Sequence, residues 1–170
     1  MTGSGALVAD SATEADAQAI AAVRTAAAVR LTERFGRGHW SSASSEKQAL
    51  RSMRNGRVIV ARSGMVLLGS LTLVTKKPWA IDPSYFVAVK RPLYLIDMAV
   101  DPLAQGQGIG RFLLDEAERV ARAWPAQAIW LDAYDAPAGA GGFYAKCGYR
   151  EVGRKSYRGV PLIYYEKLLT

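Results

Sequence analysis

Hydrophobic residues in the first half of the chain recur first with a helical and then with a strand-like period. Apolar side chains three and four residues apart predict an amphipathic helix, which Thr13 caps and which runs to about Phe35. A second helix is expected after the polar run 41–45 and should end at the helix-stop pair 55–56. The other apolar stretches predict strands at 6–9, 57–62 and 65–75, with the last two joined as a hairpin through 63–64.

The second half of the chain alternates strands with shorter helices. The apolar run 93–100 predicts a strand, and a glycine-rich loop follows it. After this loop, an apolar stripe from Ile109 to Trp124 predicts a helix that Pro125 ends. The remaining pattern predicts a strand at 128–133, a short helix at 140–146, and a closing strand pair at 149–157 and 162–169, joined through 159–161.

The segment from Lys76 to Arg91 has no regular pattern. It contains prolines and the exposed-looking aromatic residues Trp79, Tyr85 and Phe86. Two interpretations remain open, because such aromatic side chains either shape a substrate mouth or pack under a loop or at a dimer contact. The second use is the more common one for any single residue.

Length and composition favour one soluble domain over residues 1–170. Half of the 170 residues are hydrophobic, and no apolar run is long enough to span a membrane. The single cysteine, Cys147, excludes an internal disulfide, and the first residues do not resemble a secretion signal, so we expect a cytoplasmic protein without a membrane partner. The net charge of +7 is spread along the chain, and we therefore expect no nucleic-acid partner.

The glycine loop between the strand at 93–100 and the following helix is the strongest functional signal. Glycines at 106, 108 and 110 let a ligand approach the backbone, and the N–H groups that open a helix bind phosphate oxygens, so the loop predicts a polyphosphate ligand. The dinucleotide fingerprint fails because its sixth position is Arg111. The nucleoside-triphosphate loop fails because no Gly-Lys-Ser/Thr follows.

Two motifs carry a resemblance to a known family. Gln-Gly-Gln-Gly-Ile-Gly at 105–110, preceded by Val-Asp-Pro, resembles the acyl-coenzyme A signature of the Gcn5-related N-acetyltransferases, the GNAT family. Gly-Phe-Tyr-Ala-Lys-Cys-Gly-Tyr at 142–149 is similar to the closing segment of that family. The resemblance implies an α+β acetyltransferase fold, with a mixed, mainly antiparallel sheet of six to seven strands and about four helices. It further implies acetyl-CoA as cosubstrate, no metal, and a fold that often forms homodimers.

The resemblance also implies which residues hold acetyl-CoA. In the family, a bulged strand before the glycine loop binds the pantetheine arm, and the loop N–H groups bind the pyrophosphate. The corresponding residues here are Met98, Ala99, Val100, Gln105, Gly106, Gln107, Gly108, Ile109, Gly110 and Arg111. Two departures matter: Pro137 stands where the family often has an asparagine, and Gln105 replaces the usual arginine.

Three residues are candidates for proton transfer. Tyr144 matches the family's tyrosine that faces the coenzyme A sulfur, and a phenol with an ordinary pKa near 10 suits the protonation of a thiolate. Asp132, in a Trp-Leu-Asp-Ala strand similar to that of the ribosomal-protein alanine acetyltransferases, is the first candidate for the base and would act through a water. Asp97 is the second candidate. Each of these residues also has a structural alternative, as a packed aromatic ring or as a solvated or ion-paired carboxylate.

These observations predict an N-acetyltransferase that moves an acetyl group from acetyl-CoA to a primary amine by direct attack. The acceptor remains open between a small-molecule amine and a peptide or protein N-terminus. The alternative is a non-enzymatic acyl-CoA sensor on the same fold, which would not need the acid Tyr144.

Overall fold

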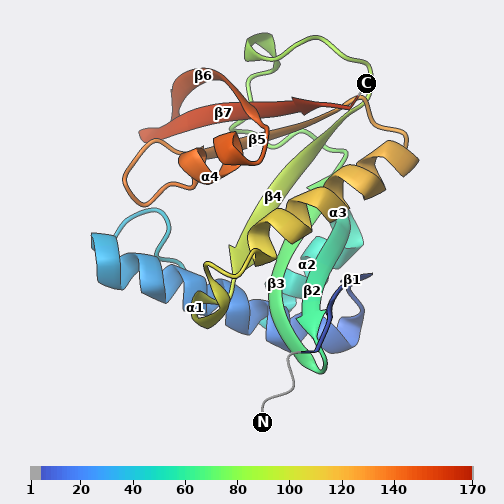
Figure 1. The fold of residues 1–170 in the computed structure, drawn as a ribbon. Coiled ribbons are helices and arrows are strands. Elements are labelled where there is room, and N and C mark those ends of the chain that lie inside the picture. The colour runs from blue at the N-terminus through green and yellow to red at the C-terminus, as the bar shows by residue number, and fades with distance from the viewer. Residues whose placement is uncertain (1–4, 170) are drawn as a thin grey trace. The chain divides into compact units, whose positions relative to one another are not determined.

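The computed structural model describes residues 5–169, and it contains the predicted strands and helices with small shifts in their bounds (Figure 1). The strands are β1 (Leu7–Ser11), β2 (Arg57–Ser63), β3 (Val66–Val74), β4 (Pro92–Val100), β5 (Ala128–Tyr134), β6 (Arg150–Tyr157) and β7 (Val160–Leu168). The α-helices are α1 (Ala17–Phe35), α2 (Glu46–Asn55), α3 (Ile109–Ala123) and α4 (Gly141–Lys146). Three short 3-10 turns are η1 (Glu14–Asp16), η2 (Pro83–Tyr85) and η3 (Pro102–Ala104).

Hydrogen bonding links the strands into one seven-stranded sheet with the order β1-β2-β3-β4-β5-β7-β6. The sheet is mixed, since β4 and β5 run parallel while β5, β7 and β6 run antiparallel. The parallel pairing is short: it joins Pro92–Tyr94 to Ala128–Trp130. This arrangement confirms the expected α+β fold.

The chain forms two compact units, each built from two segments. Unit 1 comprises the chain up to Leu73 together with Ile96–Ala117, and unit 2 comprises Val74–Leu95 together with the chain from Glu118 onward. The expectation of a single domain over residues 1–170 stays a prediction. Among residues 5–169, no helix is long and apolar enough to cross a bilayer.

Unit 1 packs two helices against a hairpin. Ser45 caps α2 in a reciprocal pair with Gln48, as the polar run before this helix predicts. β1, β2 and β3 form antiparallel pairs, and the hydrophobic faces of α1 and α2 meet residues of β2 and β3. The buried core of this contact consists of Ala17, Ile20, Val23, Ala49, Val58, Val60 and Leu67. Burial of each Val, Leu or Ile side chain contributes about 1.5–3 kcal/mol.

In unit 2, the segment from Lys76 to Arg91 is held in place by several contacts with β5 and β7. Phe86 is buried and stacks on Trp130, with ring centroids 4.5 Å apart and planes at 17°. The fully buried Glu166 accepts a hydrogen bond from the Val87 N–H at 3.1 Å, and the Tyr164 hydroxyl donates to the Ala80 carbonyl. Of the two interpretations of these aromatic residues, packing under a loop is therefore confirmed for Phe86, because strand β5 provides an aromatic partner for its ring.

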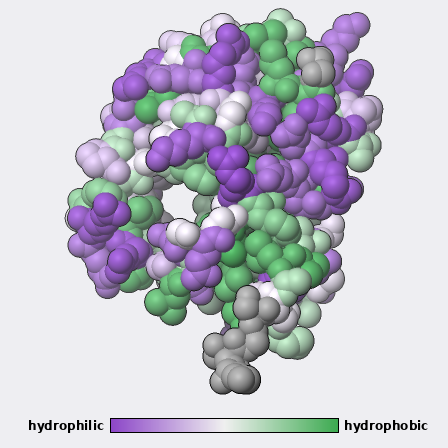
Figure 2. All heavy atoms as spheres, in the orientation of Figure 1, coloured by the Kyte–Doolittle hydropathy of each residue, from purple (hydrophilic) through white to green (hydrophobic). Residues whose placement is uncertain are grey.

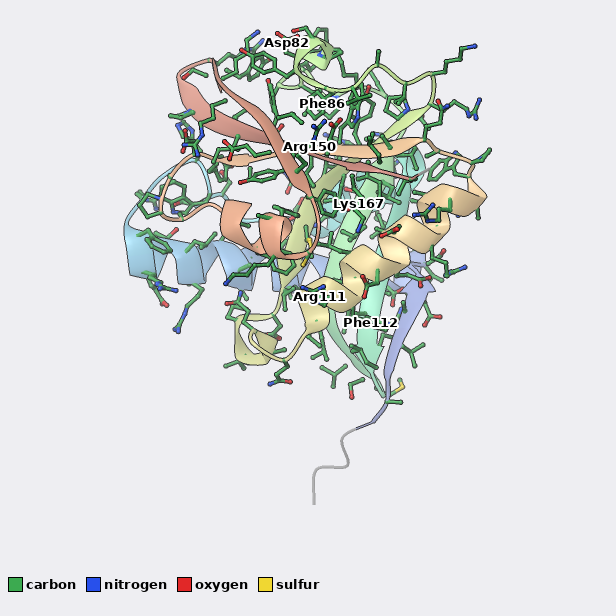
Figure 3. The ribbon with its side chains drawn as sticks, turned by 45° about the horizontal axis from the view of Figure 1, so that its top comes forward. Asp82, Phe86, Arg111, Phe112, Arg150 and Lys167 are labelled. Carbon is green, nitrogen blue, oxygen red and sulfur yellow. The ribbon has the colours of Figure 1, made fainter. Side chains whose placement is uncertain are left out.

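Not every aromatic residue of this segment is packed away. Trp79 is 82% exposed, and Tyr85 lies edge-on to Tyr164 with centroids 5.3 Å apart. A Cβ at Gly153 would overlap the Tyr85 ring at 2.2 Å, so glycine is required on β6 for this contact. Figure 3 shows Asp82 and Phe86 on the segment, and Asp82 forms an ion pair with Lys155 of β6 at 2.5 Å.

The closing strand pair differs slightly from the prediction. The turn between β6 and β7 is Arg158-Gly159, and both residues have positive φ, at 49° and 78°. This combination is typical of the two-residue hairpin turn that matches the twist of the strands. β7 consequently begins at Val160, and Pro161 lies inside the strand.

Candidate active site

The glycine loop of unit 1 is open to solvent and has the backbone that its sequence requires. Gly106 and Gly108 are exposed and have φ values of 80° and 82°, a region that favours glycine. A Cβ added at either position would meet nothing within 4 Å. The space above both glycines is therefore free for a ligand to approach the backbone.

The loop is anchored on both sides. Before it, the Asp101 N–H donates to the Leu68 carbonyl of β3 at 2.8 Å, and the Asp101 carboxylate accepts from the Leu103 N–H at 2.9 Å. After it, the Phe112 N–H donates to the Gly108 carbonyl at 3.0 Å, which starts the hydrogen bonding of α3. Figure 3 shows Arg111 and Phe112 on this first turn of the helix.

The start of α3 is suited to a pyrophosphate. The first N–H groups of a helix have no intrahelical partner, and the helix dipole places partial positive charge there. The backbone N–H groups of Gly106, Gln107 and Gly108 come directly before these donors in the chain. Gln105 is turned toward the preceding strand, with its amide nitrogen 3.4 Å from the Val100 carbonyl oxygen. A polyanionic group such as that of acetyl-CoA fits this donor set.

β4 is irregular at the position before the predicted pantetheine residues. Asp97 is exposed and has a φ of 53°, which is uncommon for a residue other than glycine and is typical of a bulge. Met98, Ala99 and Val100 follow it, each half-buried. The predicted distortion of this strand is therefore present, one residue earlier than the residues expected to hold the pantetheine arm.

Gly69 of β3 allows the close packing behind this part of β4. A Cβ at Gly69 would lie 3.0 Å from the Ala99 carbonyl oxygen and 3.0 Å from Leu113 Cδ1 of α3. Any larger residue would push against both the strand and the helix that flank the loop. This role of Gly69 is not evident from the sequence, where a glycine inside a strand pattern carries no motif.

Tyr144 of unit 2 is buried in an aromatic cluster. Its ring centroid lies 5.4 Å from Phe143, 5.8 Å from Tyr149 and 6.0 Å from Tyr165. Burial raises the pKa of the Tyr144 phenol well above its usual value, and the nearby Asp132 and Cys147 raise this pKa further. The expectation of an ordinary pKa is therefore wrong. The phenol stays protonated throughout the neutral range.

Asp132 lies on β5, in register with Tyr164 of β7. It is half-buried, and burial raises the pKa of its carboxyl group. A raised pKa makes a carboxylate a stronger base near neutral pH. The two candidate carboxylates thus belong to different units: Asp132 interacts electrostatically with Tyr144 in unit 2, whereas Asp97 is exposed in unit 1.

The loop before α4 contains the predicted departure from the family motif. Pro137 is exposed and offers no side-chain amide. The loop is held by a hydrogen bond from the Gly139 N–H to the Ala136 carbonyl at 2.8 Å and by an ion pair between Asp135 and Arg154 at 3.1 Å. No asparagine-type contact to a cofactor arm is available from position 137.

Sequence reasoning missed Arg24 of α1, a half-buried arginine within unit 1. Its Nη1 donates to the Ser52 hydroxyl at 3.3 Å and its Nη2 donates to the Thr72 hydroxyl at 3.4 Å, while its Nε is buried without a hydrogen-bond partner. Burial lowers the pKa of Arg24, and the charge of Asp97 opposes this shift. The sequence does not single out Arg24, because the helix carries two more arginines and Arg30 likewise follows a valine.

Within residues 5–169, no group of three or more His, Cys, Asp or Glu side chains could hold a metal ion. The expected absence of a metal stays a prediction.

Hydrophilic and hydrophobic side chains are interspersed over the face drawn in Figure 2.

Comparison with known proteins identifies the class. The model of the acetyltransferase (GNAT) family matches residues 26–149, which is most of the chain. The chain therefore belongs to this family and is, by class, an acetyl-CoA-dependent N-acetyltransferase. None of the curated proteins matches the sequence significantly.

Solved structures with the same fold are distant in sequence. An N-acetyltransferase from Staphylococcus aureus Mu50 has a TM-score of 0.72 and 19% identity, over 98% of this chain and 100% of that one. Ribosomal-protein-alanine N-acetyltransferase from Brucella melitensis has a TM-score of 0.71 and 20% identity, over 95% and 99%. PaiA N-acetyltransferase from Thermoplasma acidophilum, in complex with coenzyme A, has a TM-score of 0.72 and 16% identity, over 96% and 99%. At these identities the likeness shows the fold alone.

Proposed function

We propose that the glycine loop binds the pyrophosphate of acetyl-CoA through backbone N–H groups from Gln105 to Arg111, and that Met98, Ala99 and Val100 bind its pantetheine arm. The observation that carries this proposal is the open, left-handed backbone at Gly106 and Gly108 directly before α3. Helix N-terminal donors of this kind bind phosphate without any basic side chain. The replacement of the family's arginine by Gln105 is therefore tolerable.

The proposed reaction is direct transfer to a primary amine. Acetyl-CoA supplies the acetyl thioester; the amine nitrogen forms a bond to the acetyl carbon while the carbon–sulfur bond breaks, giving an amide and free coenzyme A. The attacking nitrogen must lose one proton, and the departing thiolate must gain one. The chain's own residues carry these two protons.

Asp132 is the proposed base and Tyr144 the proposed acid. The raised pKa of Asp132 suits acceptance of a proton from the amine through a water, since a base is most effective when its pKa approaches the working pH. The buried Tyr144 phenol stays protonated and can donate to the thiolate. Its raised pKa weakens it as an acid, which makes its contribution smaller than that of an ordinary phenol. Asp97 is the alternative base.

The proposed reaction does not specify which amine accepts the acetyl group. Of the proteins with the same fold, one is named as a ribosomal-protein-alanine N-acetyltransferase and another as an aminoglycoside 6'-acetyltransferase. Both a peptide N-terminus and a small-molecule amine are thus compatible with the fold. We further propose that the protein is cytoplasmic, does not bind nucleic acid and can form a homodimer. Light scattering of the purified protein tests the homodimer.

The first test is a thermal-shift titration with acetyl-CoA beside NADH and ATP. Ligand at a hundredfold its dissociation constant stabilises the folded state by about 2.7 kcal/mol, which raises the midpoint by roughly 5 to 10 °C for a chain of this size. Stabilisation by acetyl-CoA alone supports the loop assignment. A response to NADH or ATP instead would overturn it.

The second test separates the enzyme from the sensor. The protein is incubated with acetyl-CoA and a panel of amines, peptides and amino acids, and free thiol is measured. Steady thiol release that depends on an acceptor supports the transferase. Binding of acetyl-CoA without release for any acceptor favours the sensor.

A further inference from the structure

Asp132, the proposed base, lies on a face of the unit 2 strands that the strand register defines. Asp132 of β5 is directly opposite Tyr164 of β7, and Tyr164 is in turn opposite Gly153 of β6. Two residues before Asp132 on the same strand, Trp130 is opposite Glu166. Directly opposite residues point to the same face of a sheet, and so do alternate residues along a strand, so these five residues share one face.

The segment from Lys76 to Arg91, called the 76–91 segment from here on, packs on this face. The Phe86 ring stacks on Trp130 and lies 5.3 Å from the Tyr164 ring. The Tyr85 ring lies edge-on to Tyr164, also at 5.3 Å. The segment therefore covers both neighbours of the proposed base, which are the residue two positions earlier on β5 and the residue directly across on β7.

The other face of the same strands packs against helices. The ring of Tyr165 on β7 lies 6.0 Å from the ring of Tyr144 on α4, and Lys167 forms an ion pair with Glu118 of α3 at 3.1 Å. Figure 1 shows α4, in orange, and the 76–91 segment, in green, on opposite sides of β7. The 76–91 segment thus packs on the face that carries the proposed base, and the helices pack on the opposite face.

Two buried side chains of β7 hold the backbone of the 76–91 segment. Tyr164 is fully buried, and its hydroxyl donates a hydrogen bond to the Ala80 carbonyl. Glu166 is 1% exposed, and its carboxylate accepts hydrogen bonds from the Val87 N–H at 3.1 Å and from the Arg150 guanidinium. A buried carboxylate is costly unless it is paired and hydrogen-bonded, so the segment backbone meets part of the requirement of Glu166.

A third link between the segment and the strands is exposed. Asp82 of the segment forms an ion pair with Lys155 of β6 at 2.5 Å. Exposed ion pairs contribute little to stability. The two buried links from β7 therefore account for most of the hold on the segment.

The titratable groups around Asp132 come from several elements. Its charge raises the pKa of the phenols of Tyr164 on β7 and Tyr144 on α4. The charges of Lys155 on β6 and Asp82 on the 76–91 segment also act on the Tyr164 phenol. The same face further carries Tyr94 of β4, Glu166 of β7 and Arg150 of β6. The cause of the raised pKa of Asp132 itself is burial, so the elements that exclude water from this face determine its proton affinity.

We propose that Tyr164 and Glu166 are positioning residues that hold the 76–91 segment over Asp132 and thereby limit the access of water to this carboxylate. The inference rests on the proposed reaction, in which Asp132 is the base. Neither positioning residue touches the reacting groups in that scheme. When the hold is weakened, water reaches Asp132, its charged form becomes less costly, and its pKa falls towards the ordinary value.

The first test follows the segment and Asp132 in the same samples. Native-state hydrogen exchange reports on the Val87 amide, and NMR with isotope-labelled aspartate follows the Asp132 carboxyl group, which is assigned with Asp132→Asn. Tyr164→Phe keeps the ring and removes its hydroxyl. Val87 exchange should become about 2- to 10-fold faster, since loss of one neutral hydrogen bond has an effect of this size. The titration of Asp132 should move to lower pH.

Tyr165→Phe is the matched control, because Tyr165 is the next residue on β7, is similarly buried and points to the opposite face. It should leave Val87 exchange and the Asp132 titration as in wild type. Faster Val87 exchange in Tyr164→Phe with an unchanged Asp132 titration would overturn the proposal. Unchanged Val87 exchange in that variant would overturn it as well, because the hydroxyl would then not hold the segment.

Glu166→Gln tests the second link. Loss of the charged acceptor should accelerate Val87 exchange about 10- to 100-fold and again move the Asp132 titration to lower pH. Glu151→Gln is the control, since Glu151 is exposed and pairs with Arg154. The substitution at Glu166 alters a buried ion pair and endangers the fold, so thermal unfolding is measured first. If Glu166→Gln is unfolded, Tyr164→Phe alone decides the proposal.

Activity connects the segment with the reaction. With an acceptor that releases thiol, Tyr164→Phe should move the acidic limb of kcat to lower pH and lower its plateau about two- to fivefold, because a weaker base accepts the proton less readily. Lys155→Met, which removes the exposed link, should leave the limb in place. A lower kcat with an unmoved limb would show that Tyr164 acts only through the fold, which overturns the proposal.

Failure of this proposal is distinguishable from failure of the proposed function. If no acceptor releases thiol, the transferase fails, while hydrogen exchange and the Asp132 titration still decide whether the segment limits water at this carboxylate. If thiol is released and Tyr164→Phe changes neither the Asp132 titration nor the acidic limb, the positioning role is overturned and the transferase stands.

Discussion

The glycine loop of unit 1 and the Asp132–Tyr144 pair of unit 2 differ in how each would perform its proposed role. The loop is exposed, relies on backbone N–H groups, and depends on glycine for its conformation. The pair is partly or fully buried and relies on two side chains whose pKa values are raised by burial. Binding a polyanion needs only correctly directed donors, whereas proton transfer needs particular side chains in a dry setting.

This difference explains which departures from the family pattern matter. Gln105 in place of arginine removes a charge but no backbone donor, so the loop retains its function in the proposed scheme. Replacement of the glycines or of Tyr144 and Asp132 would remove the essential feature of each region. The predictions below test this contrast, beginning with the largest expected effect.

Gly108→Val should weaken acetyl-CoA binding on the order of 10³-fold. A β-branched side chain at a φ of 82° strains the backbone. If the loop changes conformation to relieve this strain, it loses two or more charge-assisted hydrogen bonds to the pyrophosphate, of about 1.5–3 kcal/mol each. Calorimetry measures the dissociation constant. Gly159→Val, at a φ of 78° in the β6–β7 turn, introduces the same strain elsewhere and should leave acetyl-CoA affinity unchanged. Equal losses in both variants would show that strain alone is responsible.

Asp132→Asn should lower kcat on the order of 10²-fold and abolish the acidic limb of its pH profile. A base must be deprotonated, so the wild-type rate falls as pH drops through the raised carboxyl pKa. Asp97→Asn is the comparison variant and should leave the acidic limb in place. If Asp97→Asn instead removes the acidic limb and Asp132→Asn does not, Asp97 is the base.

The same substitution at Asp132 should stabilise the protein at neutral pH. Because its pKa is raised in the folded state, the ionised carboxylate opposes folding above that pKa, and the opposition disappears at pH values below the pKa of the unfolded chain. Asp132→Asn should therefore have a higher Tm than wild type at pH 7, and the difference should shrink on acidification. Thermal unfolding across pH 4–8 measures it; a lower Tm at pH 7 would contradict the burial argument.

Tyr144→Phe should lower kcat about 10-fold with little change in KM for acetyl-CoA, since the phenol is the proton donor of the proposed reaction. Because the phenol pKa lies well above its ordinary value, the wild type should show no loss of kcat up to about pH 9.5 from tyrosine ionisation. Tyr94→Phe, which removes the hydroxyl of another buried tyrosine in unit 2, is the control and should retain wild-type kcat. Equal effects of the two variants would exclude the acid role.

Lys155→Met should have the smallest effect. Lys155 is the main cause of the lowered pKa of Asp82, which is about 2, and the Ser84 hydroxyl and N–H contribute further. The interaction between Lys155 and Asp82 stabilises the folded state at pH values above the ordinary carboxyl pKa, and this contribution is lost as the pH falls through about 2. An exposed ion pair contributes little to stability. Neither residue has a role in the proposed reaction, so kcat should stay within about twofold of wild type. NMR titration should show the Asp82 pKa rising in the variant; an unchanged value would refute the pairing.

Local patterns were sufficient for most of the fold. The helix stripe of α1, the cap at Ser45 and the glycine loop each involve residues close together in sequence, and the structure has each of them near its predicted position. The sequence leaves open whether Phe86 is packed, because its stacking partner, Trp130, lies 44 residues away and no local period reveals it. The sequence pattern predicts the β6–β7 turn one or two residues too late, because it places Pro161 in the turn, whereas the structure has it inside β7.

The sequence by itself determined the family, the strand–loop–helix that is proposed to bind acetyl-CoA, and the candidate residues Tyr144, Asp132 and Asp97. These follow from short-range periodicity and from glycines whose backbone freedom is a property of the residue. Only the tertiary structure decided the burial that raises the pKa values of Tyr144 and Asp132, the need for glycine at position 69, and the burial of the Arg24 Nε without a hydrogen-bond partner. Desolvation and electrostatic pairing depend on neighbours from distant parts of the chain, and folding alone brings these together.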